Sequence, residues 1–390
     1  MTGQAIDAAA SVRVLHVITG LNTGGAETAL CRLLETLRPP AFEHVVVALG
    51  PPGSLSARIG AVAQLHHLGM NPVQPRPRDL WRLRRIVRAS GSDVVHCWMY
   101  HANIAATLAA MGLGIPVLWG IRSLYNPEKQ KRLTRLVIRG GALLSRHPRQ
   151  VLYNSVVSAR LHEAAGYDAT HTRVIPNGFD TDLFRPDSAA RLRLREALDL
   201  PADALLIGLV ARVHPMKDHA NFLRAAALFA VDYPHTHFVL VGDGAEAGNA
   251  ELAEQIEKLQ LQSCVHLLGR RTDIAAIDSA LDIASSSSSW GEAFPNVIGE
   301  AMACGVPCVA TDVGDVPQII GDTGVVVPTR DPHALAAGWG RLAALDAPAR
   351  RALGLRARQR IIERYSLPAV SAQYADLYTS VIQQTIIKQG

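Results

Sequence analysis

Short apolar runs alternate with segments of helical periodicity along most of this chain, and the alternation occurs twice. Apolar runs rich in β-branched residues are typical of buried parallel strands, and apolar residues at helical spacing are typical of amphipathic helices. Because strand–helix–strand crossovers build parallel sheets, the pattern predicts an α/β fold with two doubly wound, Rossmann-like sheets. The predicted strands are residues 12–19, 44–49, 94–97, 116–120, 150–153, 204–211, 237–241, 265–268, 283–285, 306–310 and 324–327. The predicted helices are residues 26–37, 102–111, 128–145, 155–165, 218–231, 249–259, 332–345, 348–365 and 369–386.

A cluster of turn-forming residues separates the two series. Residues 174–186 contain Pro176, the pair Asn177 and Gly178, and Pro186, a density typical of a linker between domains. We expect an N-terminal domain over residues 1–178 and a C-terminal domain over residues 179–365, with residues 366–390 packing back on the N-terminal domain. Ligands of open α/β sheets bind beyond the carboxyl ends of the strands, so the expected site is a cleft between two such edges.

The composition narrows the class of protein further. With 48% hydrophobic residues and 5% aromatics in 390 residues, the chain has the profile of a soluble α/β protein. No stretch approaches the roughly 20 apolar residues that span a bilayer. The five cysteines are scattered without a CxxC or Cys/His cluster, which predicts reduced thiols and no metal site. The first ten residues lack the basic and apolar regions of a secretory signal, so we expect a cytoplasmic protein.

The charges are distributed unevenly. Residues 1–180 contain 20 Lys+Arg and 10 Asp+Glu, whereas residues 181–390 contain 19 and 24. The basic residues concentrate in segments 76–88 and 129–149. Two interpretations stay open, namely solvated helix faces and contact with an anionic membrane at its inner face. Nucleic acid is not an expected partner, because the chain has no interleaved aromatics and no zinc spacing.

Two carboxylates flank a candidate helix start in segment 286–300. Glu292 precedes it and Glu300 lies within the predicted helix, so both can reach one pocket at different depths. Pro295 suits the first helical turn, whose free amides carry a partial positive charge. A carboxylate accepts hydrogen bonds from vicinal hydroxyls, as in sugars; the alternative is that Glu300 is an exposed helix residue. The expected anion-binding turn contains Phe294, Pro295, Asn296 and Val297.

Cations and glycines follow other predicted strands. Arg212 and Lys217 come after strand 204–211, where a guanidinium and an ammonium suit a diphosphate, although each is also compatible with a solvated loop. Gly24 and Gly25 precede a helix, and Gly242 follows a strand. Such glycines let the backbone approach a phosphate, but a simple turn has the same composition and no GxGxxG spacing is present.

A histidine and an asparagine follow the strand over residues 94–97. His101 and Asn103 come at or just past its end, where a side chain can project into a cleft. A histidine in this place can assist proton removal from an acceptor hydroxyl. It can equally bond a backbone carbonyl or cap the next helix, and His96 is the expected core histidine.

Taken in order, these segments resemble the family-4 retaining glycosyltransferases, which have the two-domain GT-B architecture. The resemblance runs from about Val12 to Tyr365. Each motif is weak alone, but their order and spacing are specific. The motifs are GGAE (24–27), DVVH (93–96), NS (154–155), VIPNGFD (174–180), ARVHPMKDH (211–219), LVGDG (240–244), LGRRTDI (268–274), the Glu292 and Glu300 pair, and EAMACGVPCVATDVGD (300–315).

The resemblance implies a role for each site residue. Arg212 and Lys217 look like the pair that binds the donor diphosphate. Glu300 looks like the carboxylate that holds the ribose, and Glu292 like the one that contacts the donor sugar. Residues near Arg270 are expected to meet the base.

Backbone amides of residues 294–297, with Gly24, Gly25 and Gly242, would complete the donor site, and His101 and Asn103 would lie on the acceptor side. The family needs no divalent metal for transfer, and the chain has no DxD motif near the expected cleft.

The chain departs from the family pattern in two places. The family often has HxH at the end of the N-terminal strand, whereas here Trp98 follows His96 and Cys97, and the next histidine is His101. This departure leaves open which histidine faces the acceptor. Ala211 stands where the family more often has glycine, and we expect this buried position to accommodate the small alanine side chain.

These expectations combine into one function. The chain is expected to move a hexosyl sugar from a UDP- or GDP-linked donor to an acceptor hydroxyl with retention, in surface polysaccharide or glycolipid assembly. The acceptor is expected to be a lipid-linked glycan. We favour attack from the face that the diphosphate leaves, because no carboxylate nucleophile stands out. The alternatives are a nucleotide-sugar epimerase of the same fold and a non-catalytic sugar-nucleotide binding protein.

Overall fold

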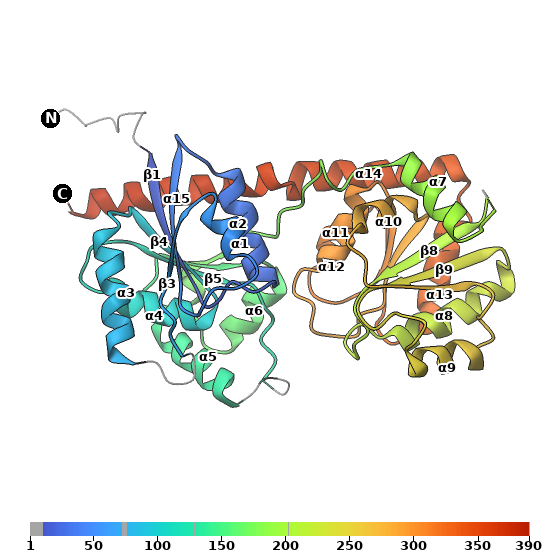
Figure 1. Ribbon diagram of the computed structural model, residues 1–390, viewed down its shortest axis with the longest axis horizontal. Coiled ribbons are helices and arrows are strands. Elements are labelled where there is room, and N and C mark those ends of the chain that lie inside the picture. The colour runs from blue at the N-terminus through green and yellow to red at the C-terminus, as the bar shows by residue number, and fades with distance from the viewer. Residues whose placement is uncertain (1–10, 72–75, 128–129, 131, 202, 390) are drawn as a thin grey trace. The chain divides into compact units, whose positions relative to one another are not determined.

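The computed structural model describes residues 11–71, 76–127, 130, 132–201 and 203–389. The chain divides into two compact units (Figure 1). The N-terminal unit comprises Met1–Gly178 and Leu367–Gly390, and the C-terminal unit comprises Phe179–Ser366. The first ten residues, and Glu128 and Lys129 at the start of one predicted helix, lie outside the described residues.

The N-terminal unit contains a seven-stranded parallel sheet in the order β3-β2-β1-β4-β5-β6-β7. Its strands are β1 (Val12–Ile18), β2 (Phe42–Ala48), β3 (Gln64–His67), β4 (Val94–Trp98), β5 (Val117–Ile121), β6 (Gln150–Tyr153) and β7 (Thr172–Val174). Its helices are α1 (Gly25–Thr36), α2 (Ser56–Gly60), α3 (Pro77–Ala89), α4 (Tyr100–Ala110), α5 (Arg132–Leu144), α6 (Val156–Ala164), a 3-10 turn (Ala169–His171) and α15 (Leu367–Gln389).

Alternation along β1 gives this unit two cores. Leu15 and Val17 pack with the buried residues of α3, α4 and α5. Val14 and Ile18 point to the other face and pack with α1, α2 and α15. Because both faces of the parallel sheet are covered, its central strands are mainly apolar, which explains their hydrophobic runs.

Polar side chains connect α15 to the sheet. The hydroxyl of Tyr378 and Nδ1 of His96 are hydrogen-bonded at 2.8 Å. Within the sheet, between β4 and β1, Trp98 donates to Nδ1 of His16 at 3.2 Å. Arg122 donates to the Tyr374 hydroxyl at 2.9 Å. The last helix therefore belongs to the N-terminal unit, and Figure 1 shows it in red against the strands of that unit.

The C-terminal unit contains a six-stranded parallel sheet in the order β10-β9-β8-β11-β12-β13. Its strands are β8 (Leu205–Val210), β9 (Thr236–Val241), β10 (Val265–Gly269), β11 (Ile283–Ser286), β12 (Cys308–Thr311) and β13 (Val325–Val327). Its helices are α7 (Ser188–Ala197), α8 (His219–Asp232), α9 (Ala250–Lys258), α10 (Ile274–Ala280), α11 (Asn296–Ala303), α12 (Val316–Ile320), α13 (Pro332–Ala343) and α14 (Ala347–Tyr365).

This second sheet is also covered on both faces. Ile207 and Leu209 of β8 pack with α8, α9 and α13 around Trp339, whose indole donates to the Ser285 hydroxyl at 3.1 Å. Leu206 points to the face covered by α11, α12 and α14. Both sheets thus hold their strands in fixed positions, with the carboxyl ends along one edge.

The two predicted Rossmann-like sheets are confirmed. The sequence patterns missed the edge strands β3 and β7, because Gln64–His67 and Thr172–Val174 are short and mostly polar. They also missed the helices α2, α3, α7, α10 and α12. Helices α3 and α7 are rich in arginine, and the other three are only five to seven residues long.

The histidines beneath α15 predict acid sensitivity of the N-terminal unit. Burial lowers the pKa of His96 from 6.5 to about 3, and burial, with His44 and His96 nearby, lowers the pKa of His16. Unfolding releases both rings to water, where they take up protons below about pH 6.5. The contribution of these histidines to the free energy of unfolding is therefore fully present above about pH 6.5. It decreases as the pH falls from about 6.5 toward 3, by up to about 1.4 kcal/mol per pH unit for each histidine.

Urea unfolding at pH 7.0, 6.0 and 5.0 checks this expectation in a window where most carboxylates are still ionised in the unfolded chain. We expect the free energy of unfolding to decrease steadily from pH 6.5 to pH 5.0. A constant free energy across that range would show that the buried histidines carry no such penalty.

Candidate functional site

The strand order of the C-terminal unit reverses between β8 and β11, which makes the carboxyl ends of these strands the expected ligand position. Lys217 follows β8 and Glu292 follows β11. Their side chains form an ion pair between Nζ and Oε1, with only 15% and 13% of each side chain exposed. The two predicted site residues thus lie in contact at the point where the strand order of the sheet reverses.

Serine side chains fix both loops around this ion pair. Ser288 donates to Oε1 of Glu292 at 3.1 Å, and Ser287 donates to the carbonyl of Lys217 at 2.7 Å. The amide of Ser289 donates to the carbonyl of Met216 at 2.8 Å. The serine run therefore joins the loop after β11 to the loop after β8. These contacts keep the Lys217 ammonium and the Glu292 carboxylate beside each other.

Helix α11 begins beside this loop without a side-chain cap. The structure places Pro295 at the N-cap, one residue before the helix rather than in its first turn. The amide end carries partial positive charge and suits an anion. Phe294 points away from solvent, stacking on Phe179 with ring centroids 6.0 Å apart, so it can offer only its backbone to a ligand. Asn296 and Val297, which open the helix, are partly exposed.

Glu300 lies one turn into α11 and is partly exposed. The carboxyl group of Asp278, on α10, is fully buried nearby. Burial raises the pKa of Asp278 well above its usual range, and the Glu300 carboxylate raises it further. Burial therefore favours the protonated form of Asp278, which limits its repulsion of the Glu300 carboxylate.

Glycines shape the neighbouring strand ends. A Cβ on Gly242 would clash with the carbonyl group of Ala211, and its φ of 145° also favours glycine. This close approach brings the loop after β9 to the loop after β8, where Val213 donates to the carbonyl of Asp243 at 2.7 Å. Arg212 and Arg270, which follow β8 and β10, have exposed side chains.

The N-terminal unit repeats the arrangement, because its strand order reverses between β1 and β4. Gly24 is the N-cap of α1, with an extended backbone and no side-chain cap. A side chain on Gly24 would clash with the Glu27 carboxylate, whereas Gly25 has open space around it. The predicted glycine pair is therefore a helix start at a switch point, as expected for an anion site.

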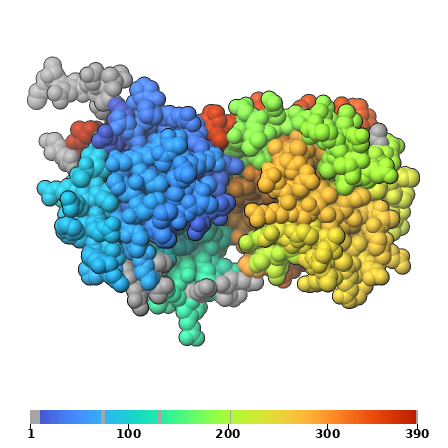
Figure 2. Space-filling model, viewed as in Figure 1, coloured from blue at the N-terminus to red at the C-terminus, as the bar shows by residue number. Residues whose placement is uncertain are grey.

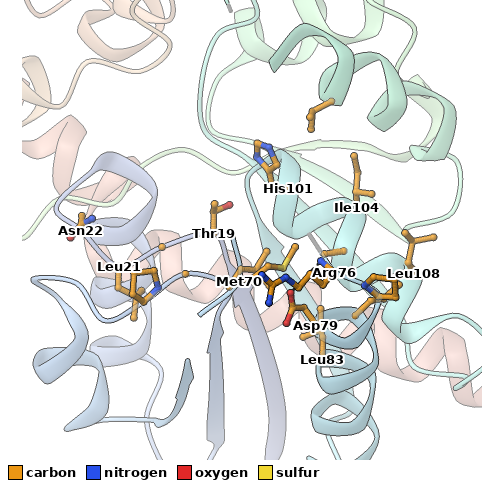
Figure 3. Close-up of a pocket in the computed structure, with 18 residues that line it drawn as sticks. Thr19, Leu21, Asn22, Met70, Arg76, Asp79, Leu83, His101, Ile104 and Leu108 are labelled. Atoms are coloured by element: carbon orange, nitrogen blue, oxygen red, sulfur yellow. Dashed lines mark hydrogen bonds between the residues drawn. The ribbon is translucent and has the colours of Figure 1, made fainter. Parts of the chain in front are cut away.

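A cavity of about 580 Å³ lies at this edge of the N-terminal sheet (Figure 3). His101, in the first turn of α4, lines the cavity with Thr19 and Asn22 from the loop after β1. Burial lowers the pKa of His101, which favours the neutral imidazole. Asn103 is buried and does not line the cavity. Within the described residues, neither its Oδ1 nor its Nδ2 has a hydrogen-bond partner.

The structure also shows functional candidates that the sequence patterns did not single out. Ser288 contacts Glu292 directly, and the only signal for it was its place in a serine run after a strand. Asp278 carried a signal, because helical spacing puts it on the apolar face of Ile274 and Ile277. No sequence pattern indicated the apolar wall of the cavity, because its side chains come from separate helices and loops.

Two further kinds of feature are absent from the residues that the structure describes. In the residues that the structure describes, no three or more His, Cys, Asp or Glu side chains are grouped so as to hold a metal ion. Over the same residues, the structure contains no helix with the length and apolar character that crossing a membrane requires.

Comparisons with known proteins agree with this geometry. Residues 23–183 match a family model described as Glycosyltransferase Family 4, and residues 204–344 match one described as Glycosyl transferases group 1. The chain is 28% identical to a putative glycosyltransferase, EpsF, of Bacillus subtilis, over 77% of this chain and 79% of that protein. It is 30% identical to a D-inositol 3-phosphate glycosyltransferase of Xylanimonas cellulosilytica, over 75% of this chain and 73% of that protein.

Solved structures show the same fold. HepE of Anabaena in complex with UDP is similar with a TM-score of 0.83 at 23% identity, over 95% of this chain and 100% of that one. HepE in complex with UDP-glucose is similar with a TM-score of 0.78, also at 23% identity, over 94% of this chain and 99% of that one.

Gly314 gives a direct test of how the Glu292 loop is held. Its φ is +58°, and a Cβ there would clash with the carbonyl oxygens of Glu292 and Ala293. We expect Gly314→Ala to lower the free energy of unfolding by about 1–3 kcal/mol. Gly340→Ala is the matched control, because Gly340 lies inside α13 with open space around it; it should be neutral or stabilise by about 0.5–1 kcal/mol. Equal urea midpoints for the two variants would contradict the close packing of this loop.

Proposed function

This chain belongs to the family-4 glycosyltransferases of the GT-B fold, and we propose that it transfers a hexosyl sugar from a UDP- or GDP-linked donor with retention of configuration. The observation that carries the proposal is the Lys217–Glu292 ion pair at the β8–β11 switch point, beside the uncapped start of α11. The two HepE structures with UDP and UDP-glucose support a nucleotide-sugar donor.

The donor diphosphate is assigned to the positive groups of the C-terminal unit. Lys217 supplies an ammonium, Arg212 supplies an exposed guanidinium, and the α11 amides supply a partial positive charge. Together these groups neutralise charge that develops on the departing diphosphate, the role that a divalent ion has in other transferases. We therefore propose that transfer needs no metal. Gly24 and Gly25 at the start of α1 are proposed to offer backbone amides to an anionic group of the donor.

The carboxylates are assigned to hydroxyl groups of the donor. Glu292 is already turned toward Lys217, so it can accept hydrogen bonds from the sugar while Lys217 meets the phosphate. Glu300, one turn along α11, is assigned to the ribose. The exposed Arg270 and its neighbours are assigned to the edge of the base. Gly242 is assigned to the donor site because, without a side chain, its backbone can lie close to the donor.

The proposed chemistry occurs on one face of the sugar. The bond between the anomeric carbon and the phosphate oxygen breaks, and the acceptor oxygen bonds to that carbon from the same side. The acceptor proton passes to the departing phosphate oxygen, so no strong protein base is required. His101 is assigned to the acceptor side, where its neutral imidazole can hydrogen-bond the attacking hydroxyl. Asn103, which is buried, would act only by supporting the first turns of α4.

The acceptor is proposed to be a lipid-linked glycan at an anionic inner membrane face, in polysaccharide or glycolipid assembly. Residues 76–149 contain 14 Lys+Arg and 3 Asp+Glu, and such a segment is attracted to anionic headgroups. Cosedimentation with vesicles containing phosphatidylglycerol should exceed that with phosphatidylcholine alone. Equal cosedimentation would remove the support for a membrane partner.

A donor panel followed by product analysis tests the proposed activity. The donor that binds should raise the melting temperature, because ligand binding stabilises the folded state by mass action. Proton NMR of the product should show the anomeric configuration of the donor. Inversion would refute the retaining proposal, and conversion of the donor to an epimer without acceptor would favour an epimerase.

The ribose assignment of Glu300 predicts a change in selectivity. The wild type should bind the nucleoside diphosphate at least about tenfold more tightly than its 2′-deoxy form, since a hydrogen bond to a charged group contributes about 1.5–3 kcal/mol. Glu300→Gln should reduce this ratio toward one in calorimetric titrations. Glu254→Gln is the control, because Glu254 is an exposed helix residue paired with Lys258. An unchanged ratio in Glu300→Gln would exclude the ribose role.

A further inference from the structure

The cavity of the N-terminal unit is lined mainly by apolar side chains. The loops after β1, β2 and β3 form one part of the wall, and α3, α4 and α5 form the rest. Its apolar lining residues include Leu21, Leu49, Met70, Leu83, Ile104 and Val137, and its polar lining side chains are those of Thr19, Asn22, Arg76, Asp79 and His101. A sugar is bound mainly through its hydroxyls, so a wall with few hydrogen-bonding groups suits a hydrocarbon better than a glycan.

The apolar lining continues onto the surface. Leu80 of α3 and Leu108 of α4 both line the cavity, and they are 36% and 39% exposed. Other large apolar side chains are exposed on α3 and α5: Trp81 is 62% exposed, and Leu143 is 74% exposed. Figure 2 shows α5, in blue-green, at the surface of this unit.

Positive charge surrounds the same elements. Arg78, Arg82, Arg85 and Arg88 are exposed along α3, and Arg85 lies over the Trp81 ring at 5.9 Å. Arg132 and Arg139 are exposed on α5. A partner that complements both features has an apolar segment and a negatively charged group.

We propose that this cavity holds a hydrocarbon segment of an anionic amphiphilic acceptor, and the inference rests on the proposed function. His101 lies in the first turn of α4, and Leu108 lies seven residues later, about 10 Å along the helix axis. In Figure 3, Ile104 and Leu108 follow His101 along one side of the cavity. The hydrocarbon lies along α4 between these residues, and the end that bears the acceptor hydroxyl lies near His101.

Alkyl phosphates with 6 to 12 carbons test this assignment on the full-length protein, without nucleotide and below their micelle concentrations. Burial of each methylene contributes about 0.8 kcal/mol, so affinity should rise about fourfold per carbon until the cavity is full. Affinity for the phosphates should fall with added salt, whereas affinity for 1-octanol should not. Affinity independent of chain length would overturn the proposal.

Variants separate the cavity from the exposed surface. Ala105→Trp fills the cavity, because Ala105 lines it, and it should abolish the dependence on chain length. Leu108→Asp, at a partly exposed lining position, is the second variant if Ala105→Trp does not fold. Leu192→Ser, at an exposed leucine of the C-terminal unit, should bind like the wild type. Wild-type chain-length dependence in a folded cavity variant would show that the phosphates bind elsewhere.

Two further outcomes keep this inference distinct from the proposed function. Transfer to a water-soluble acceptor without any alkyl phosphate binding would overturn the cavity assignment and leave the activity intact. Alkyl phosphate binding without nucleotide-sugar transfer would refute the proposed function and leave a hydrocarbon site.

A dimer in light scattering that blocks alkyl phosphate binding would overturn the cavity assignment, because a second copy of the chain would then cover this face.

Discussion

The ion pair between Lys217 and Glu292 is the interaction on which the candidate site depends. Both side chains are largely removed from water, and charges in such a place need partners to offset the loss of hydration. The Glu292 carboxylate accepts hydrogen bonds from the Lys217 ammonium and from the Ser288 hydroxyl. The pair therefore keeps an ammonium available at the sheet edge, where a more negative group such as a diphosphate can compete for it.

The surrounding fold explains why this pair occurs where it does. Parallel strands place their carboxyl ends along one edge, and the reversal of strand order at β8 and β11 separates the two following loops. Ser287 and Ser289 then hold these loops together, and Gly314 permits the close approach behind Glu292. The same logic places Gly24 and His101 after β1 and β4 in the N-terminal unit.

Much of this arrangement could be predicted from the sequence, because it depends on local order. Apolar runs located most strands, and strand ends located Lys217, Glu292 and His101. Edge strands such as β3 escaped detection because a short strand of Gln, Leu and two His has no apolar run. The raised pKa of Asp278 and the apolar cavity depend on contacts between distant elements, which no local pattern encodes. Asn103 shows the reverse case, since its position after a strand suggested access but the packing of α4 buries it.

The most direct test of the central claim is a set of binding titrations with UDP and GDP on the wild type, Lys217→Gln, Glu292→Gln and the double variant. If Lys217 binds the diphosphate, Lys217→Gln should weaken binding by about tenfold or more, since a charge-assisted hydrogen bond contributes about 1.5–3 kcal/mol. Glu292→Gln should bind the diphosphate at least as tightly as the wild type, because it releases the ammonium, and the double variant should resemble Lys217→Gln. Equal affinity in all four proteins would contradict the assignment of the diphosphate to this ion pair.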